Sequence, residues 1–91
     1  MDSDLPQAAQ ALATLVRRRR RDLDLTQQTL ADLAGVGVAF LYALENGKTT
    51  LRLDKVLAVL STLGLGLRLG PDRTLIAAAD GWATDTDEDA S

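Results

Sequence analysis

Apolar residues recur three and four positions apart in four stretches of the chain, which is the spacing of a helix with one buried face. The pattern predicts helices from the N-terminal segment to about residue 22, over about 27–34, over about 38–45 and over about 53–63. The predicted inward positions are Leu12, Leu15, Val16 and Leu23, then Leu30, Ala31 and Ala34, then Leu41 and Leu44, and finally Val56, Leu57, Leu60 and Leu63.

Residues that begin and end helices agree with these limits. Thr26 is a good N-cap for the second helix, because its hydroxyl can accept a backbone N–H of the first turn. Gly35 follows that helix as a residue able to take a positive φ, and Asn46-Gly47 breaks the third helix. Two short helices joined by a tight turn are typical of a DNA-reading helix-turn-helix.

The hydrophobic period changes after residue 64. Leu65-Gly66-Leu67-Arg68-Leu69 alternates apolar with small or charged residues, which predicts a strand. We predict no second strand, and one helical turn over Thr74 to Ala79, so the backbone groups of this strand lack a partner within the chain. The economical arrangement pairs Leu65, Leu67 and Leu69 with the same strand of a second copy, across a two-fold axis. The alternative is a frayed extension of the fourth helix.

The predicted fold class is therefore all-α, with four to five helices and a short C-terminal strand that pairs across a dimer. The 91 residues fit one small domain. With no Cys and no His, disulfides, Cys/His metal sites and an imidazole base are excluded. No stretch approaches the ~20 apolar residues of a membrane span, and no signal peptide is visible. We therefore expect a cytoplasmic protein without membrane contact. We also expect no enzyme activity, because no nucleophile–base arrangement appears, and no cofactor.

Charge divides the chain into two unlike parts. Residues 1–70 carry nine basic and seven acidic side chains, whereas residues 71–91 carry one arginine and six acids. We therefore predict a DNA-binding and dimerisation domain at 1–70 and an acidic, mobile tail at 71–91. Trp82 is a candidate anchor for a basic partner. The alternatives are an inert solubilising tail and a tail that competes with DNA for the arginines of the chain.

Four residues of the third helix face outward when its leucines face the core, and a helix presented in this way enters a major groove. They are Val38, Ala39, Tyr42 and Ala43. Val38 and Ala39 suit thymine methyl groups, but they cannot read G or A by paired hydrogen bonds. Tyr42 alone has a polar tip, and its alternative role is a surface aromatic packed on a neighbour.

Candidate phosphate contacts lie on both sides of that helix. Gln27 stands in the first turn of the second helix, where the helix N-terminus favours an anion. Lys48, Thr49 and Thr50 follow the third helix and are placed to grip the other side of the groove. The alternatives are a solvated Gln27 and threonines that only form the turn before the fourth helix.

Arg17 to Arg21 is the densest run of charge in the sequence. Successive helical residues point about 100° apart, so at least one arginine of the run must lie near the core. The others form a basic collar for DNA phosphates, with Arg17 and Arg18 as candidate contacts. The alternative is a solvated helical surface balanced by Asp22 and Asp24.

The segment from Arg20 through Leu69 resembles the Cro/phage-repressor type of helix-turn-helix, also called the XRE family. Within that family it looks like the HipB-type antitoxins of bacterial toxin–antitoxin pairs. The closing helix followed by a Leu-x-Leu-x-Leu strand points to the antitoxin branch. The matching elements are Leu25-Thr26-Gln27, Leu30-Ala31, Gly35-Val36, Leu44-Glu45-Asn46-Gly47-Lys48 and the run Leu53 to Leu69.

This resemblance implies a homodimer that binds a pseudo-palindromic operator upstream of its own operon and represses it. It implies a toxin partner, a HipA-like serine/threonine kinase. It also implies an ion pair between Arg20 and Glu45, a phosphate contact by Gln27 and base reading from the outward side of the third helix. The chain departs from the family at Val38 and Ala39, where members commonly carry polar residues.

Two alternatives stay open beside the antitoxin. One is a stand-alone regulator without a toxin, which only the neighbouring gene distinguishes. The other is a protein-interaction module with a degenerate DNA surface, which the small apolar patch of Val38, Ala39 and Ala43 favours.

Overall fold

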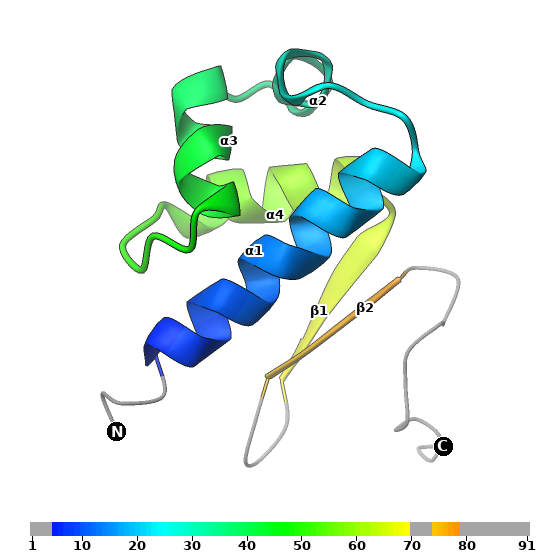
Figure 1. The fold of residues 1–91 in the computed structure, drawn as a ribbon. Helices are drawn as coiled ribbons and strands as arrows, with labels where there is room; N and C mark the ends of the chain where they lie inside the picture. The colour runs from blue at the N-terminus through cyan, green and yellow to red at the C-terminus, as the bar shows by residue number, and fades with distance from the viewer. Residues whose placement is uncertain (1–4, 70–73, 79–91) are drawn as a thin grey trace.

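The computed structural model describes residues 5–69 and 74–78. Four helices come first, α1 (Leu5–Asp22), α2 (Gln27–Ala34), α3 (Val38–Glu45) and α4 (Leu53–Thr62). Two strands follow, β1 (Leu65–Leu69) and β2 (Thr74–Ala78). Figure 1 shows α2 and α3 at the end of the domain farthest from the two strands, with α1 and α4 between them. The described part of the chain is mostly helical, and its helices begin and end close to the predicted limits.

The connection between α2 and α3 is a tight turn fixed by the residues at its ends. Thr26 has an extended backbone, and its hydroxyl accepts the backbone N–H of Thr29 at 3.0 Å, which satisfies a free donor of the first turn. Gly35 closes α2 with a φ of 74°, and the Val36 N–H returns to the Ala31 carbonyl at 3.0 Å. The N-cap and the left-handed glycine are both as the sequence predicts.

The core lies where the four helices and β1 meet. Leu41 and Leu44 of α3 are buried, so the opposite side of α3 faces away from the core. Burial of such a side chain stabilises the fold by about 1.5–3 kcal/mol before the loss of conformational entropy is counted. The buried members of the core are Val16, Leu30, Ala31, Leu41, Leu44, Val56, Val59, Leu60, Leu63 and Leu65.

Leu23 was predicted to face inward, and that prediction was wrong. Its side chain is 43% exposed, because α1 already ends at Asp22 and the chain turns away from the helical path. Asp24 makes this turn with a φ of 59°, a left-handed conformation that aspartate adopts more readily than most residues. Ala13, which the spacing did not select, is fully buried on α1 instead.

The buried face of α4 is also turned relative to the prediction. Leu57 is exposed, whereas Val59 is buried. The buried positions of α4 are Val56, Val59 and Leu60, which are three and four apart and so lie on one side of the helix. Packing of α4 against α2 and β1 decides that Val59 is buried in place of Leu57.

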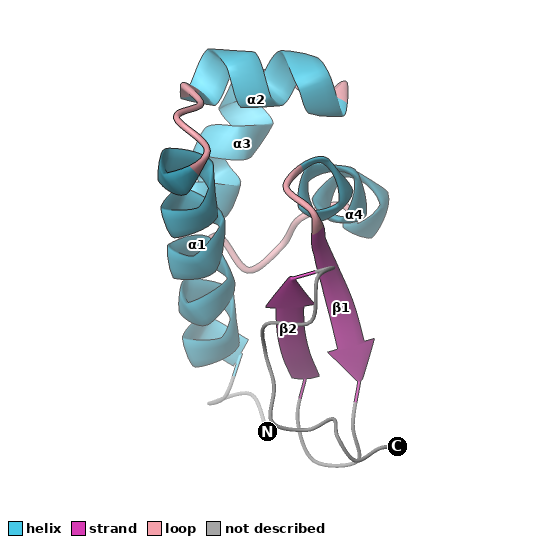
Figure 2. Cartoon of the chain, turned by 90° about the vertical axis from the view of Figure 1, so that its right-hand side faces the viewer, coloured by secondary structure: helices cyan, strands magenta, loops and turns pink. Residues whose placement is uncertain are grey.

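β1 forms at the predicted residues, but it has a partner within the chain. β2 lies antiparallel to it, with Leu65 opposite Ala78 and Leu67 opposite Ile76. The predictions of a lone strand and of a helical turn at 74–79 were therefore wrong. Thr74 to Ala78 is a short apolar run, and periodicity does not separate a strand from a helix in such runs. Figure 2 shows this hairpin below α4 and beside the N-terminal part of α1.

Candidate nucleic-acid interface

The outward side of α3 presents the residues that the sequence analysis placed near DNA bases. Tyr42 is 61% exposed, Val38 and Ala39 are also exposed, and Ala43 is half-buried. Phe40 packs against the core instead, with the Lys55 ammonium 5.8 Å from the centre of its ring. This surface is apolar apart from the Tyr42 hydroxyl, so it offers methyl groups and one phenol to a groove.

The loop after α3 places its predicted phosphate contacts in solvent. Gly47 adopts a φ of 81°, and the Lys48 N–H returns to the Ala43 carbonyl at 3.1 Å, which ends the helix in a defined way. Lys48, Thr49 and Thr50 are exposed, with no hydrogen bond from their side chains to the rest of the described chain. Their polar groups are therefore free to contact phosphate oxygens.

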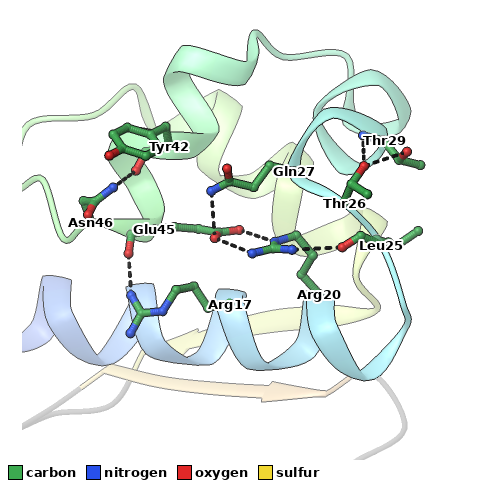
Figure 3. A network of polar contacts seen from close by, with 9 residues as sticks. All are labelled: Arg17, Arg20, Leu25, Thr26, Gln27, Thr29, Tyr42, Glu45 and Asn46. Atoms are coloured by element: carbon green, nitrogen blue, oxygen red, sulfur yellow. Dashed lines mark hydrogen bonds and ion pairs between the residues drawn. The ribbon is translucent and has the colours of Figure 1, made fainter.

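Gln27 lies at the first position of α2, but its side chain is not simply solvated. It is half-buried, and its Nε2 donates to the carboxylate Oε1 of Glu45 at 3.1 Å. Figure 3 shows Gln27 and Tyr42 on the same side of this polar network, with Arg17 and α1 on the other side. The Gln27 amide therefore connects the candidate DNA surface with the buried carboxylate of Glu45.

Glu45 is the centre of that network. Its side chain is 1% exposed, and it accepts from Arg20 Nε at 2.7 Å on Oε2 and from Arg20 Nη2 at 3.0 Å on Oε1 (Figure 3). Arg20 Nη1 also donates to the Leu25 carbonyl at 2.9 Å. The hydrogen bond to Glu45 raises the pKa of Arg20 above its ordinary value, against the opposing effect of burial. This ion pair fixes the end of α3 to the last turns of α1.

Two more arginines of the run hold helix ends. Arg17 Nη1 donates to the backbone carbonyl of Glu45, at the end of α3, and Arg19 Nε donates to the Leu63 carbonyl at 2.8 Å, at the end of α4. Free carbonyls and the helix dipole make a C-terminus a favourable place for a cation. From the sequence, Arg17 was predicted to contact phosphate, and Arg19 was placed only as part of the basic collar or of a solvated helical surface. Sequence spacing alone carried no signal for these contacts, because their acceptors are backbone atoms of distant segments.

The exposed remainder of the arginine run is smaller than the predicted basic collar. Arg18 and Arg21 are exposed, and the side chain of neither has a hydrogen bond or ion pair within the described residues. Arg18 therefore keeps the position expected of a phosphate contact. Arg17 is half-buried and already donates to Glu45 and to the Thr14 hydroxyl.

The predicted dimer-strand residues lie on β1, away from α3 (Figure 1). Leu65 is buried against the core, and Leu67 is 36% exposed. Leu67 lines an apolar groove of about 450 Å³ with leucines and alanines of α1 and with Leu53, Val56 and Leu60 of α4. Lys48, Thr49 and Leu51 of the loop after α3 also line this groove. Trp82 lies outside the described residues, and Leu69 is placed only as the last position of β1, opposite Thr74.

The chain is similar to helix-turn-helix proteins over the segment that forms this site. The helix-turn-helix family matches residues 16–69, from the arginine run to the end of β1. An uncharacterised HTH-type transcriptional regulator, y4mF of Sinorhizobium fredii, is 46% identical over 56 residues, which cover 62% of this chain and 74% of that protein. Within residues 5–69 and 74–78, none of the helices is long and apolar enough to cross a bilayer.

Proposed function

Because the chain belongs to the helix-turn-helix family, we propose that it is a sequence-specific transcriptional repressor of its own operon that binds duplex DNA through α3. The observation that carries this proposal is the exposed side of α3, with Val38, Ala39 and Tyr42 presented to solvent between two sets of polar residues. A helix held in this way enters the major groove, while flanking groups bind phosphates. The similarity to a transcriptional regulator supports the same function.

In this proposal the contacts divide into two kinds. Val38, Ala39, Tyr42 and Ala43 lie near the bases, where methyl groups favour thymine and the Tyr42 hydroxyl can donate or accept. The phosphate contacts are Gln27 at the start of α2, the loop residues Lys48, Thr49 and Thr50, and Arg18 of the arginine run. Phosphate contacts set the register of the protein on DNA, and the few base contacts give the preference for one sequence.

We also propose that the repressor is a homodimer. The described sheet contains only β1 and β2, so β1 has one further edge that a second copy of β1 can join. The exposed leucines Leu5, Leu53 and Leu67 surround the apolar groove beside this strand, and a second copy would cover them. A two-fold dimer would match a pseudo-palindromic operator.

The test of DNA recognition is a titration of the full chain with duplex DNA from upstream of its own gene and with a random duplex, at several salt concentrations. We expect tighter binding to the upstream duplex and a linear fall of log affinity with log salt concentration, because phosphate contacts release counterions. Equal affinity for both duplexes would contradict the repressor proposal.

At a finer level, we propose that the protein is the antitoxin of a HipA-like kinase toxin. Support comes from the strand that directly follows α4 and from the acidic residues 79–91, with Trp82 as a candidate anchor. The decisive measurement is growth of cells that express the kinase encoded beside this gene, with and without this chain. A neighbouring gene without kinase motifs would leave a stand-alone regulator.

A second candidate function follows from the apolar character of α3. Val38 and Ala39 supply no hydrogen-bonding side chain, so this surface can also bind a protein. In that case Tyr42→Ala and Lys48→Ala would leave the biological activity intact. A large loss of DNA-dependent repression in either variant would decide for DNA.

A further inference from the structure

We propose that Glu45 is a positioning residue for DNA binding, because its buried carboxylate holds the side-chain amide of Gln27 with one N–H directed to a backbone phosphate. This inference rests on the proposed function, which supplies the phosphate. It gives Glu45 a role beyond its ion pair with Arg20, and it specifies which atom of Gln27 meets the DNA.

The first step is the orientation of the amide. Gln27 Nε2 lies 3.1 Å from Glu45 Oε1, and an ionised carboxylate can only accept hydrogen bonds. The amide atom that faces Glu45 must therefore be the nitrogen. A glutamine without such a partner can present either its nitrogen or its oxygen to solvent, so the contact with Glu45 removes an ambiguity that is normal for this side chain.

The second step is the donor that remains. The amide nitrogen carries two protons, and the bond to Glu45 uses one of them. The second proton has no acceptor among the residues that the structure describes. A phosphate oxygen can accept a hydrogen bond from this N–H, whereas the amide oxygen of Gln27 would repel a phosphate. The fixed orientation therefore presents the N–H, and not the oxygen, to DNA.

The third step is the rigidity of Glu45 itself. Arg20 donates two hydrogen bonds to its carboxylate, and the side chain is only 1% exposed. Turning the carboxylate away would leave a buried charge without its partner, which is strongly unfavourable. The series Arg20, Glu45, Gln27 therefore joins α1, α3 and α2, and it prepares the amide before DNA arrives.

The neighbouring glutamine provides a matched control. Gln28 lies on the same turn of α2, and its Nε2 also donates to a carboxylate, Asp32 Oδ1, at 2.9 Å. That pair is exposed and has no contact with Arg20. The two glutamines therefore share type and helix, and they differ in the burial and rigidity of the acceptor.

A double-mutant cycle on the full chain tests the proposal. Gln27→Met and Gln28→Met are compared in the native and in the Glu45→Gln background, with affinity measured for the upstream duplex. We expect Gln27→Met to weaken binding about tenfold in the native background, and Gln28→Met less than about twofold. In the Glu45→Gln background, Gln27→Met should cost less than about threefold, because the amide is no longer oriented. An undiminished tenfold loss, or equal losses for the two glutamines, would overturn the proposal.

A measurement on the native chain covers the case in which Glu45→Gln fails to fold. In the side-chain amide NMR spectrum, we expect one Gln27 proton to exchange with solvent more slowly than the Gln28 protons, and the other to shift when the duplex is added. Exchange as fast as that of Gln28 would refute the positioning role. If the native chain prefers no duplex, the repressor proposal fails instead, while the exchange pattern of the free protein still reports on the contact between Glu45 and Gln27.

Discussion

The two halves of α1 are joined to the rest of the domain mainly by different kinds of contact, although Gln10 of the N-terminal half also donates a hydrogen bond to the Asn46 carbonyl at 3.4 Å. In the C-terminal half, Arg17, Arg19 and Arg20 donate hydrogen bonds to the ends of α3 and α4 and to the carboxylate of Glu45. In the N-terminal half, Leu5, Leu12 and the alanines between them line an open apolar groove. Most arginines of the C-terminal half thus have hydrogen-bond partners within the domain, whereas the N-terminal half leaves apolar side chains exposed.

This difference shows that the density of charge in a sequence does not by itself mark a nucleic-acid surface. A guanidinium on a helix reaches the carbonyls at the ends of neighbouring helices, where it is stabilised by direct hydrogen bonds and by the helix dipole. Among the arginines of the run, Arg18 and Arg21 are the ones without an internal partner in the described residues. The electrostatic contribution to DNA binding must then come from fewer arginines than the sequence suggests.

The largest effect is expected when the ion pair made by the C-terminal half of α1 is removed. Arg20→Ala leaves the Glu45 carboxylate buried without its partner, so we expect the free energy of unfolding to fall by about 3–5 kcal/mol. Urea unfolding followed by circular dichroism measures it. The control is Arg21→Ala, an exposed neighbour that should stay within about 0.5 kcal/mol of the native protein. Equal unfolding midpoints for the two variants would contradict the distinction.

A smaller loss is expected for Arg19→Ala. It removes the hydrogen bond to the Leu63 carbonyl at the end of α4, which is worth about 1–2 kcal/mol for a charged donor. The same urea experiment measures it, and the affinity for DNA per folded molecule should be unchanged. A loss of DNA affinity without a loss of stability would show that Arg19 faces DNA instead.

The apolar half is tested through the groove. Leu67 is 36% exposed and lines the groove together with Leu12 and Leu15, and Leu67→Lys introduces a charge there. We therefore expect the dissociation constant of the proposed dimer to rise about tenfold. Sedimentation over a range of concentrations measures this. Arg68→Lys, which keeps the charge at the next residue of β1, serves as the control. An unchanged dimer in Leu67→Lys would place the interface elsewhere.

Arg18→Ala sharpens the comparison within the arginine run. Its side chain is exposed and unpartnered in the described residues, so stability should not change. The slope of log DNA affinity against log salt concentration should become shallower by about 0.9 for each phosphate contact that is lost. A slope equal to that of the native chain would assign Arg18 to solvent.

The smallest effect concerns an exposed ion pair that contrasts with Arg20 and Glu45. The hydrogen bond from Arg52, at 2.7 Å, is the main cause that holds the pKa of Asp54 below its ordinary value. A lowered pKa in the folded state adds stability that is present above the unfolded value and is lost as the pH falls through the folded value, below about pH 4. Arg52→Ala should raise the pKa of Asp54 in an NMR titration, while the unfolding midpoint at neutral pH stays nearly constant because the pair is exposed. An unchanged pKa would contradict the contact.

Much of the fold could be predicted from the sequence because local rules set it. Thr26 as an N-cap, Gly35 in the left-handed region and the buried Leu41 and Leu44 of α3 all follow from residue type and spacing. The outward residues of α3 followed directly, because a short helix with two buried leucines has only one opposite side. Local patterning therefore located the candidate base-contacting surface.

The remaining features depend on contacts between distant segments, which spacing does not encode. The apolar run at 74–78 was compatible with a helical turn or a strand, and pairing with β1 decides between them. Arg17 and Arg19 were assigned to solvent or DNA because their backbone acceptors at Glu45 and Leu63 are unmarked in the sequence. The amide of Gln27 was placed correctly at the start of α2, but its buried partner appears only when α2 and α3 meet.

The anchoring of three separate segments to the last turns of α1 has a consequence for the cooperativity of unfolding. The loop at Leu25, the end of α3 and the end of α4 each present a backbone carbonyl that accepts a hydrogen bond from a guanidinium group of α1, so none of them reaches its final geometry until those turns have formed. We therefore expect the amide protons at the end of α3 to exchange with solvent only through opening of the whole domain. A helix that must enter and leave a DNA groove would then behave as part of one cooperative unit, without fraying separately.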